Sequence, residues 1–92
     1  MQVAADEFRY TLSRPVIKAG PAIVQLANFG EDEHDLRLRR VGGTKTYRVG
    51  TVPPGRVAEL EARFLPGRFR LWCSLADHRA RGMSASLVVK KG

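Results

Sequence analysis

Residues 66–90 read PGRFRLWCSLADHRARGMSASLVVK, and this stretch carries most of what the sequence says about the fold. Its two ends alternate between apolar and other positions, as half-buried β-strands do. Phe69, Leu71 and Cys73 share one side of the first segment. Met83 begins the matching side of the second segment. We therefore expect two strands joined by a loop, with Cys73 and Met83 facing the core.

The rest of the chain shows the same alternation between closely spaced turn residues. Alternating segments lie at residues 8–12, 36–39 and 58–64, and the more continuously apolar run 22–28 is typical of a central strand. Proline and glycine interrupt the chain at short intervals, which favours an all-β sandwich or barrel. Residues 57–65 also fit an amphipathic helix, but we expect a strand there because the neighbouring segments are strands.

Length and composition are those of one small globular domain. With 92 residues, 43% of them hydrophobic, we expect a single domain over residues 1–92, with residues 1–6 as a disordered or expression-derived N-terminus. No apolar run approaches the roughly 18 residues of a membrane-spanning helix. The single cysteine excludes an internal disulfide. The N-terminus has no secretory signal pattern, so we expect a cytosolic protein or a mature form without its leader.

Four side chains form a candidate set of metal ligands. The chain has two histidines, one cysteine, and one methionine besides Met1. Cys73, His78 and Met83 follow one another with four residues between neighbours, and His34 lies upstream. Copper electron-transfer sites use one thiolate, two imidazoles and a weak axial thioether. The inventory therefore predicts one copper ion that cycles between Cu(II) and Cu(I).

The chain resembles the cupredoxins, the small blue copper proteins that include plastocyanin, azurin and amicyanin. The matching residues are Asn28-Phe-Gly30, His34-Asp35-Leu36, Pro66-Gly67-Arg-Phe69-Arg-Leu-Trp-Cys73, His78, Gly82-Met83 and a closing strand over 84–90. The resemblance implies a Greek-key β-sandwich of about seven to eight strands, with the copper at one pole. It also implies the ligand roles, with imidazoles from His34 and His78, the thiolate from Cys73 and the axial thioether from Met83.

The resemblance also suggests how the ligands are supported. Backbone N–H groups near residues 33 and 75 would point at the sulfur of Cys73, and such hydrogen bonds tune the potential of a metal. One position departs from the family pattern, because Glu33 stands where many cupredoxins have an asparagine that bridges the two ligand loops. A carboxylate there would instead bond Ser74 if the loops meet.

Each candidate ligand also has an ordinary structural interpretation when taken alone. A lone cysteine or methionine on an inward strand face is usually core. His34 lies among acidic residues, as in a solvated turn, and His78 fits a plain loop histidine. The combined spacing favours copper over structural zinc, which rarely uses methionine. A dinuclear copper centre would need a second cysteine, and a Cys73–His78 nucleophilic pair has no obvious oxyanion hole.

The chain is basic, with 16 Lys and Arg against 9 Asp and Glu and a formal net charge of +7. A basic surface attracts anionic partners. The strand arginines are most simply a solvated face, and too few aromatic residues accompany them for nucleic-acid binding. Arg79 and Arg81 flank His78, whose ring edge reaches the surface in relatives. They suit docking to an acidic redox protein.

The sequence therefore predicts a type 1 copper protein that shuttles single electrons and turns over no substrate of its own. Electrons would pass mainly through His78, with Trp72 beside Cys73 as a second route. We expect a monomer without a spanning membrane segment, and the resemblance implies a periplasmic or extracellular location. Two alternatives stay open, which are a module for copper storage or delivery and an electron-relay domain of a larger copper oxidase or reductase.

Overall fold

The computed structural model describes all residues, 1–92, and consists of nine β-strands without a helix. The strands are β1 Gln2–Asp6, β2 Arg9–Leu12, β3 Val16–Lys18, β4 Gly20–Asn28, β5 His34–Arg40, β6 Thr46–Val52, β7 Val57–Phe64, β8 Gly67–Trp72 and β9 Ser84–Lys90. The expected all-β class is confirmed. The structure has no helix long and apolar enough to cross a membrane.

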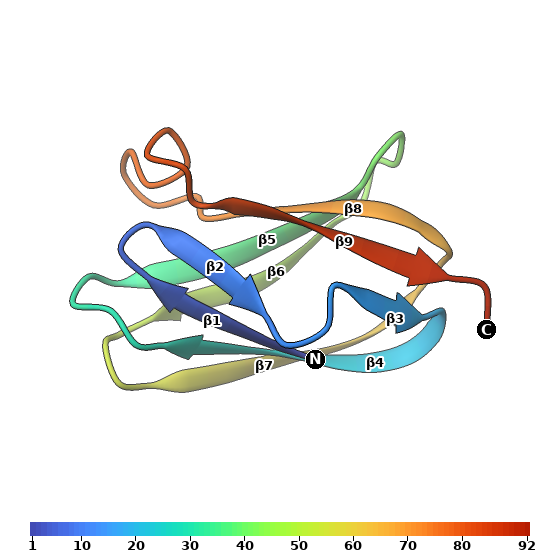
Figure 1. Cartoon of the computed structure of the whole chain (residues 1–92), viewed down its shortest axis with the longest axis horizontal. Helices are drawn as coiled ribbons and strands as arrows, with labels where there is room; N and C mark the ends of the chain where they lie inside the picture. The colour runs from blue at the N-terminus through green and yellow to red at the C-terminus, as the bar shows by residue number, and fades with distance from the viewer.

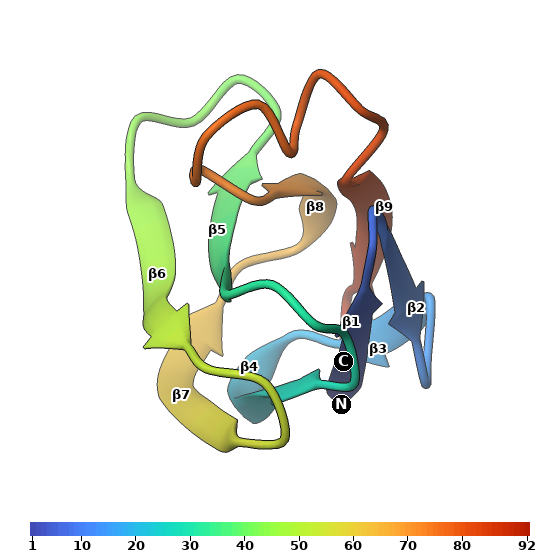
Figure 2. The ribbon, with the colours of Figure 1, turned by 90° about the vertical axis from the view of Figure 1, so that its left-hand side faces the viewer.

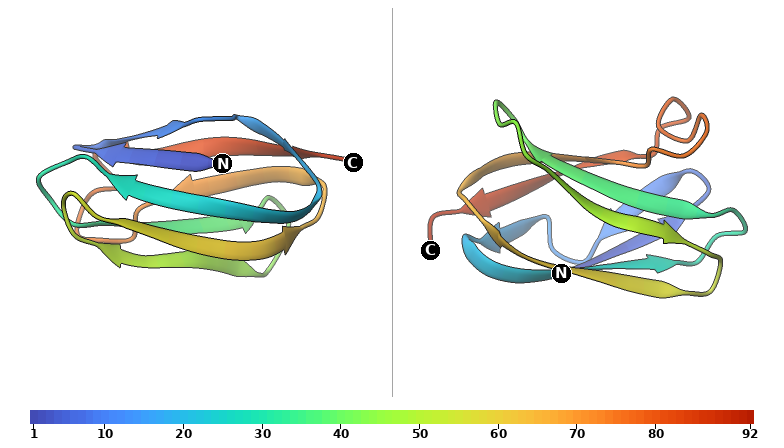
Figure 3. Two further views of the ribbon diagram at one scale, coloured as in Figure 1. Left: turned by 90° about the horizontal axis from the view of Figure 1, so that it is seen from below. Right: turned by 180° about the vertical axis from the view of Figure 1, so that it is seen from behind.

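The strands form two sheets that pack face to face (Figure 1). One sheet has the strand order β2-β1-β4-β7, and the other has the order β3-β9-β8-β5-β6. Most neighbours are antiparallel, but β1 runs parallel to β4, and β3 runs parallel to β9. The two layers are seen end-on in Figure 2 and from below and behind in Figure 3. This arrangement is the expected β-sandwich.

The period-two alternation places the core between the two sheets. Phe69 of β8 pairs with Leu87 of β9, and both side chains are buried. Phe64, at the end of β7 in the other sheet, meets Phe69 edge to face with ring centroids 5.6 Å apart. Cys73 and Met83 are buried as predicted, which brings both sulfur atoms into the same interior as these rings.

Residues 57–65, which also fitted a helix, form strand β7 up to Phe64. The strand pairs with β4 over its whole length. Its inward side chains Ala58, Leu60 and Ala62 pack against the core, whereas the residues between them are exposed. The strand interpretation is therefore confirmed. Pairing with β4 gives hydrogen-bond partners to backbone N–H and C=O groups, which in a helix would bond to one another.

The prediction that residues 1–6 are disordered is wrong. Gln2–Asp6 forms β1, which pairs with β2 on one side and with β4 on the other. Val3 and Ala5 are 0% and 1% exposed and alternate with more exposed residues. So short a segment gives a weak pattern in the sequence, because its order comes from the two strands that flank it.

Loops from both sheets meet at one end of the sandwich, on the left in Figure 1 and facing the viewer in Figure 2. They are the β1–β2 turn (7–8), the β4–β5 loop (29–33), the β6–β7 turn (53–56) and the β8–β9 loop (73–83). Asn28 ties the β4–β5 loop to the end of β6, because its side-chain amide donates to the carbonyls of Asp32 at 2.8 Å and Val52 at 2.9 Å. The candidate ligands lie at this end.

Candidate metal centre

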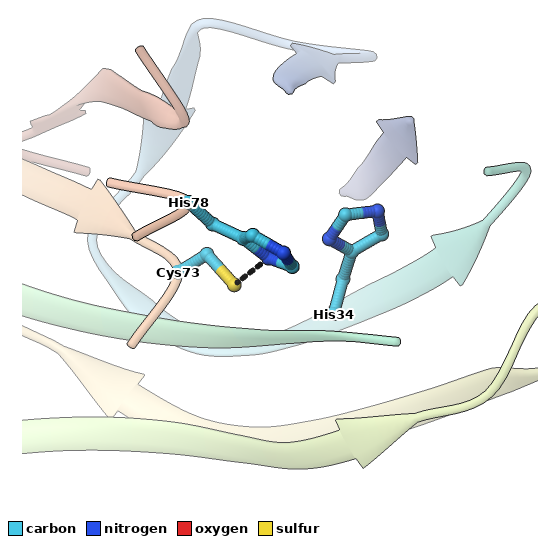
Figure 4. A group of neighbouring side chains, drawn as sticks. All are labelled: His34, Cys73 and His78. Atoms are coloured by element: carbon cyan, nitrogen blue, oxygen red, sulfur yellow. Dashed lines mark hydrogen bonds between the residues drawn. The ribbon is translucent and has the colours of Figure 1, made fainter. Parts of the chain in front are cut away.

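The structure brings three of the four predicted ligands together. His34 begins β5, Cys73 directly follows β8, and His78 lies in the β8–β9 loop. The ligand atoms of these side chains all lie within 4.8 Å of one another. Sγ of Cys73 is 3.4 Å from Nδ1 of His78, and one ring nitrogen of His34 points toward His78 (Figure 4). The three side chains are almost completely buried, so they enclose a site of one sulfur and two imidazoles.

Met83 closes the same loop and is fully buried. Its backbone carbonyl accepts the N–H of Cys73 at 3.2 Å, and its own N–H donates to the carbonyl of His78 at 3.1 Å. The loop therefore folds back on itself. These two hydrogen bonds hold the methionine next to the two other ligand candidates of the loop.

The unpaired ring nitrogens of His34 show that these residues fit a metal ion. His34 is fully buried, and neither of its ring nitrogens has a hydrogen-bond partner. A buried polar group without a partner costs about 1–3 kcal/mol, so such groups are rare in folded proteins. A metal ion on one of these nitrogens would remove that cost. A sulfur, two imidazoles and a neighbouring thioether are the donor set of copper rather than of structural zinc.

Two opposing effects act on the thiol of Cys73. Burial raises the pKa of the thiol above its usual value, and the backbone N–H groups of Asp35 and Leu75 offset only part of this rise. The amide of residue 75 was expected in this role, but the other amide lies two positions later than predicted. The β5–β6 register shifts between His34 and Leu36, which leaves Asp35 unpaired in that ladder and buried.

Asp35 joins the two segments that carry the ligands. Its Oδ1 accepts the N–H of Ser74 at 2.7 Å, and its Oδ2 accepts the Ser74 hydroxyl. The hydroxyl of Tyr10 donates to the Asp35 carbonyl, and Nε of Arg37 lies 3.5 Å from Oδ2. The hypothesis that Glu33 bonds Ser74 is wrong, because Glu33 lies before β5 begins and is exposed. Asp35 supplies the bridge between the loops instead.

Two carboxylates that the sequence did not reveal lie near the histidines. Oε1 of Glu7 is 3.4 Å from Nε2 of His34, and Oδ2 of Asp32 is 3.7 Å from Nε2 of His78. Both separations exceed those of well-formed hydrogen bonds. They leave Nδ1 of each ring free to face the thiol, as Nδ1 of His78 already does.

The expected exposure of His78 is not found, because its residue is only 6% exposed. The ring of Phe8 lies against it, with centroids 4.8 Å apart. The guanidinium of Arg81 in turn lies 5.0 Å from the Phe8 ring, and its Nε bonds Asp77 at 2.7 Å. Phe8 lies in the β1–β2 turn, so the strand that was predicted to be disordered leads directly into the side chain that covers the site.

No model of a known protein family matches the chain, and no curated protein matches its sequence. Its fold is nevertheless similar to that of several solved structures. Auracyanin A, a "blue" copper protein from the green thermophilic photosynthetic bacterium Chloroflexus aurantiacus, superposes with a TM-score of 0.82 at 12% identity, over 98% of this chain and 97% of that one. Amicyanin from Paracoccus versutus gives 0.72 at 18% identity, over 98% of this chain and 80% of that one.

A larger enzyme contains the same fold as part of its chain. The copper-containing nitrite reductase from Thermus scotoductus gives a TM-score of 0.74 at 20% identity, with 99% of this chain covering 27% of the reductase. The likenesses are of structure, since identity is low throughout. The chain therefore has the cupredoxin fold, with His34, Cys73, His78 and Met83 gathered at one end of the sandwich.

Proposed function

We propose that the protein is a type 1 copper protein that carries single electrons between redox partners. The observation that supports this most directly is the buried cluster of Cys73, His34 and His78, in which His34 has no hydrogen-bond partner of its own. Copper, when bound, supplies a one-electron couple between Cu(II) and Cu(I). The contribution of the chain is to hold a thiolate and two imidazoles in one arrangement and to exclude water from them. The Cys73 thiol loses its proton when it becomes a ligand.

The first test is a titration of the metal-free protein with Cu(II), followed by visible absorption and then by addition of a reductant. We expect an intense blue or green colour that saturates at one equivalent and bleaches on reduction. A pale product, or saturation at another stoichiometry, would contradict the proposed site.

Replacing Met83 with leucine tests the axial position. Leucine has nearly the volume of methionine, so the fold should tolerate the change at a cost below about 1.5 kcal/mol. We expect Met83→Leu to retain copper and colour but to raise the reduction potential by about 59 mV or more. For a one-electron couple, 59 mV corresponds to a tenfold change in the affinity of the protein for Cu(I) relative to Cu(II). Protein-film voltammetry measures this shift. An unchanged potential would place Met83 outside the coordination sphere.

One observation favours the carrier over copper delivery. All four candidate ligands are buried, and the most exposed of them, His78, is 6% exposed. A delivery protein must pass its metal to the ligands of an acceptor, which requires an open side. The match to part of a nitrite reductase supports a second candidate function, an electron-relay domain. The single-domain extent of 1–92, the monomeric state and the extracytoplasmic location stay predictions.

An arginine-rich groove that begins beside the β8–β9 loop supports an acidic partner. Its basic side chains come from the end of β5, from β8 and from the β8–β9 loop, and no acidic residue lines it; they are Arg39, Arg40, Arg70 and Arg79. Arg39 and Arg70 are directly paired across β5 and β8, an arrangement of like charges that is unfavourable without an anion. The guanidinium of Arg79 lies 4.8 Å from the ring of Trp72 in the same groove. That contact occupies the aromatic face that a nucleic-acid base would need.

Steering by these arginines predicts a salt effect of opposite sign for oppositely charged reagents. Oxidation of the reduced protein by anionic ferricyanide should slow by about tenfold between low and physiological ionic strength, whereas oxidation by the cationic tris(phenanthroline)cobalt(III) should speed up. Arg79→Glu should weaken both trends. Arg63→Glu is the matched control, because Arg63 is exposed on β7 in the other sheet. Stopped-flow rates that do not change with ionic strength would contradict the steering role. Equal effects of Arg79→Glu and Arg63→Glu on the salt dependence would contradict it too.

A further inference from the structure

Glu7 contacts the loop that leads into His34 as well as His34 itself. Its Oε1 accepts the N–H groups of Glu31 at 2.7 Å and Asp32 at 2.5 Å, and it lies 3.4 Å from Nε2 of His34. Neither ring nitrogen of this fully buried histidine makes a well-formed hydrogen bond, and Glu7 is the one acidic side chain with an oxygen within 4 Å of them. A single carboxylate oxygen therefore connects the β1–β2 turn, the β4–β5 loop and one candidate ligand.

The β4–β5 loop has a space that the Glu7 carboxylate fills. A Cβ at Gly30 would lie 2.5 Å from Oε1 of Glu7, which is closer than such atoms ever approach. The Gly30 N–H in turn donates to Oδ1 of Asn28 at 2.8 Å, so the loop is fixed independently on its other side. Hydrogen bonds from Asp32 and Glu31 also hold the pKa of Glu7 below its usual range, so the carboxylate is charged at neutral pH.

We propose that Glu7 is a positioning residue that holds the Nε2–H tautomer of His34 and so makes Nδ1 the metal-binding nitrogen. Histidine ligands almost always donate their second ring N–H to a carboxylate or carbonyl, which fixes the ring and raises its basicity. Glu7 is the only carboxylate with an oxygen within 4 Å of this ring's nitrogens, and the nitrogen that it approaches is Nε2. The inference rests on the proposed copper site for its redox consequence, but its structural part concerns the metal-free protein.

The structural part is tested by ¹⁵N NMR of the His34 ring in the metal-free protein, at alkaline pH where imidazoles are neutral. We expect the Nε2–H tautomer to dominate by at least about tenfold in the wild type and in Glu7→Gln, which retains an acceptor oxygen. Glu7→Ala should bring the two tautomers within about twofold of each other. Gly30→Ala should do the same by displacing the carboxylate while leaving Glu7 in the chain. An unchanged tautomer ratio in Glu7→Ala would overturn the proposal.

The redox part is tested on the copper-loaded variants. Glu7→Ala and Gly30→Ala should bind copper about 10- to 100-fold more weakly, which is the usual effect of losing such a partner. Glu7→Gln should raise the potential by about 59 mV, because a negative charge next to the ligand favours Cu(II) about tenfold over Cu(I). Glu33→Gln is the matched control, since Glu33 is exposed and adjacent to His34 in sequence but lacks the contact. Equal shifts in Glu7→Gln and Glu33→Gln would assign the effect to distant charge and overturn the contact.

The two failures are distinguishable. If the wild type binds no copper, the proposed function fails, while the tautomer measurement still decides the role of Glu7. If copper binds with the expected colour, but the His34 tautomer ratio and the copper affinity are unchanged in the Glu7 variants, the proposed function stands and the positioning role is wrong.

Discussion

Replacing Cys73 with serine is expected to abolish the blue or green colour of the copper-loaded protein completely. The colour of such sites requires a thiolate bound to Cu(II), and a hydroxyl is a hard, weakly acidic group that does not replace it. Cys73 is also buried against the core, so a hydroxyl there should lower the free energy of unfolding of the metal-free protein by about 1–3 kcal/mol. Visible absorption and urea unfolding measure the two effects separately.

Two further variants separate loss of the ligand from loss of the fold. Cys73→Ala removes the sulfur without burying a hydroxyl, and it should be equally colourless while remaining folded by circular dichroism. Met83→Leu retains the thiol and should stay coloured. An intact absorption band in either Cys73 variant would mean that the sulfur lies outside the coordination sphere, and the electron-carrier proposal would fall with the site.

The candidate ligands were predictable because their signals are local. Cys73, His78 and Met83 lie within one loop between two alternating strands, so their spacing alone places them at the same end of the sandwich. His34 was predictable through the family pattern around it. The strands were predictable for the same reason. The alternation of inward and outward side chains along a strand is visible from neighbouring residues alone.

The support of the ligands was not predictable, because it comes from distant segments and from one irregularity. Glu7 reaches His34 across 27 positions from the turn that follows β1, the segment that was expected to be disordered. Asp35 lies on the outward side of β5 by strict alternation, and only the register shift beside it accounts for its burial. The pattern of residues along the chain shows neither the Glu7 contact nor the register shift. The sequence therefore pointed to Glu33 as the partner of Ser74, a role that Asp35 has.

Replacing Asp35 with alanine is expected to have the largest effect on stability of the variants considered. The change removes a buried carboxylate that accepts two hydrogen bonds from Ser74 and lies 3.5 Å from Arg37. Breaking a buried charged network costs about 3–5 kcal/mol, which is a large part of the stability of a small domain. Urea unfolding of the metal-free protein measures the loss. Asp35→Asn retains the shape of the side chain and should lose less, which keeps the test informative if the alanine variant does not fold.

The comparison with Asp77 and Ser74 decides whether Asp35 acts by joining the two loops. Asp77 makes an equally short contact, 2.7 Å to Arg81, but both side chains are more than half exposed, so Asp77→Ala should change the urea midpoint little. Ser74→Ala removes only one of the two bonds and should cost less than Asp35→Ala. If the brace runs through Ser74, the Asp35→Ala/Ser74→Ala double variant should be little less stable than Asp35→Ala alone. Additive losses would show that Asp35 stabilises β5 by itself and not by joining β5 to the segment that follows Cys73.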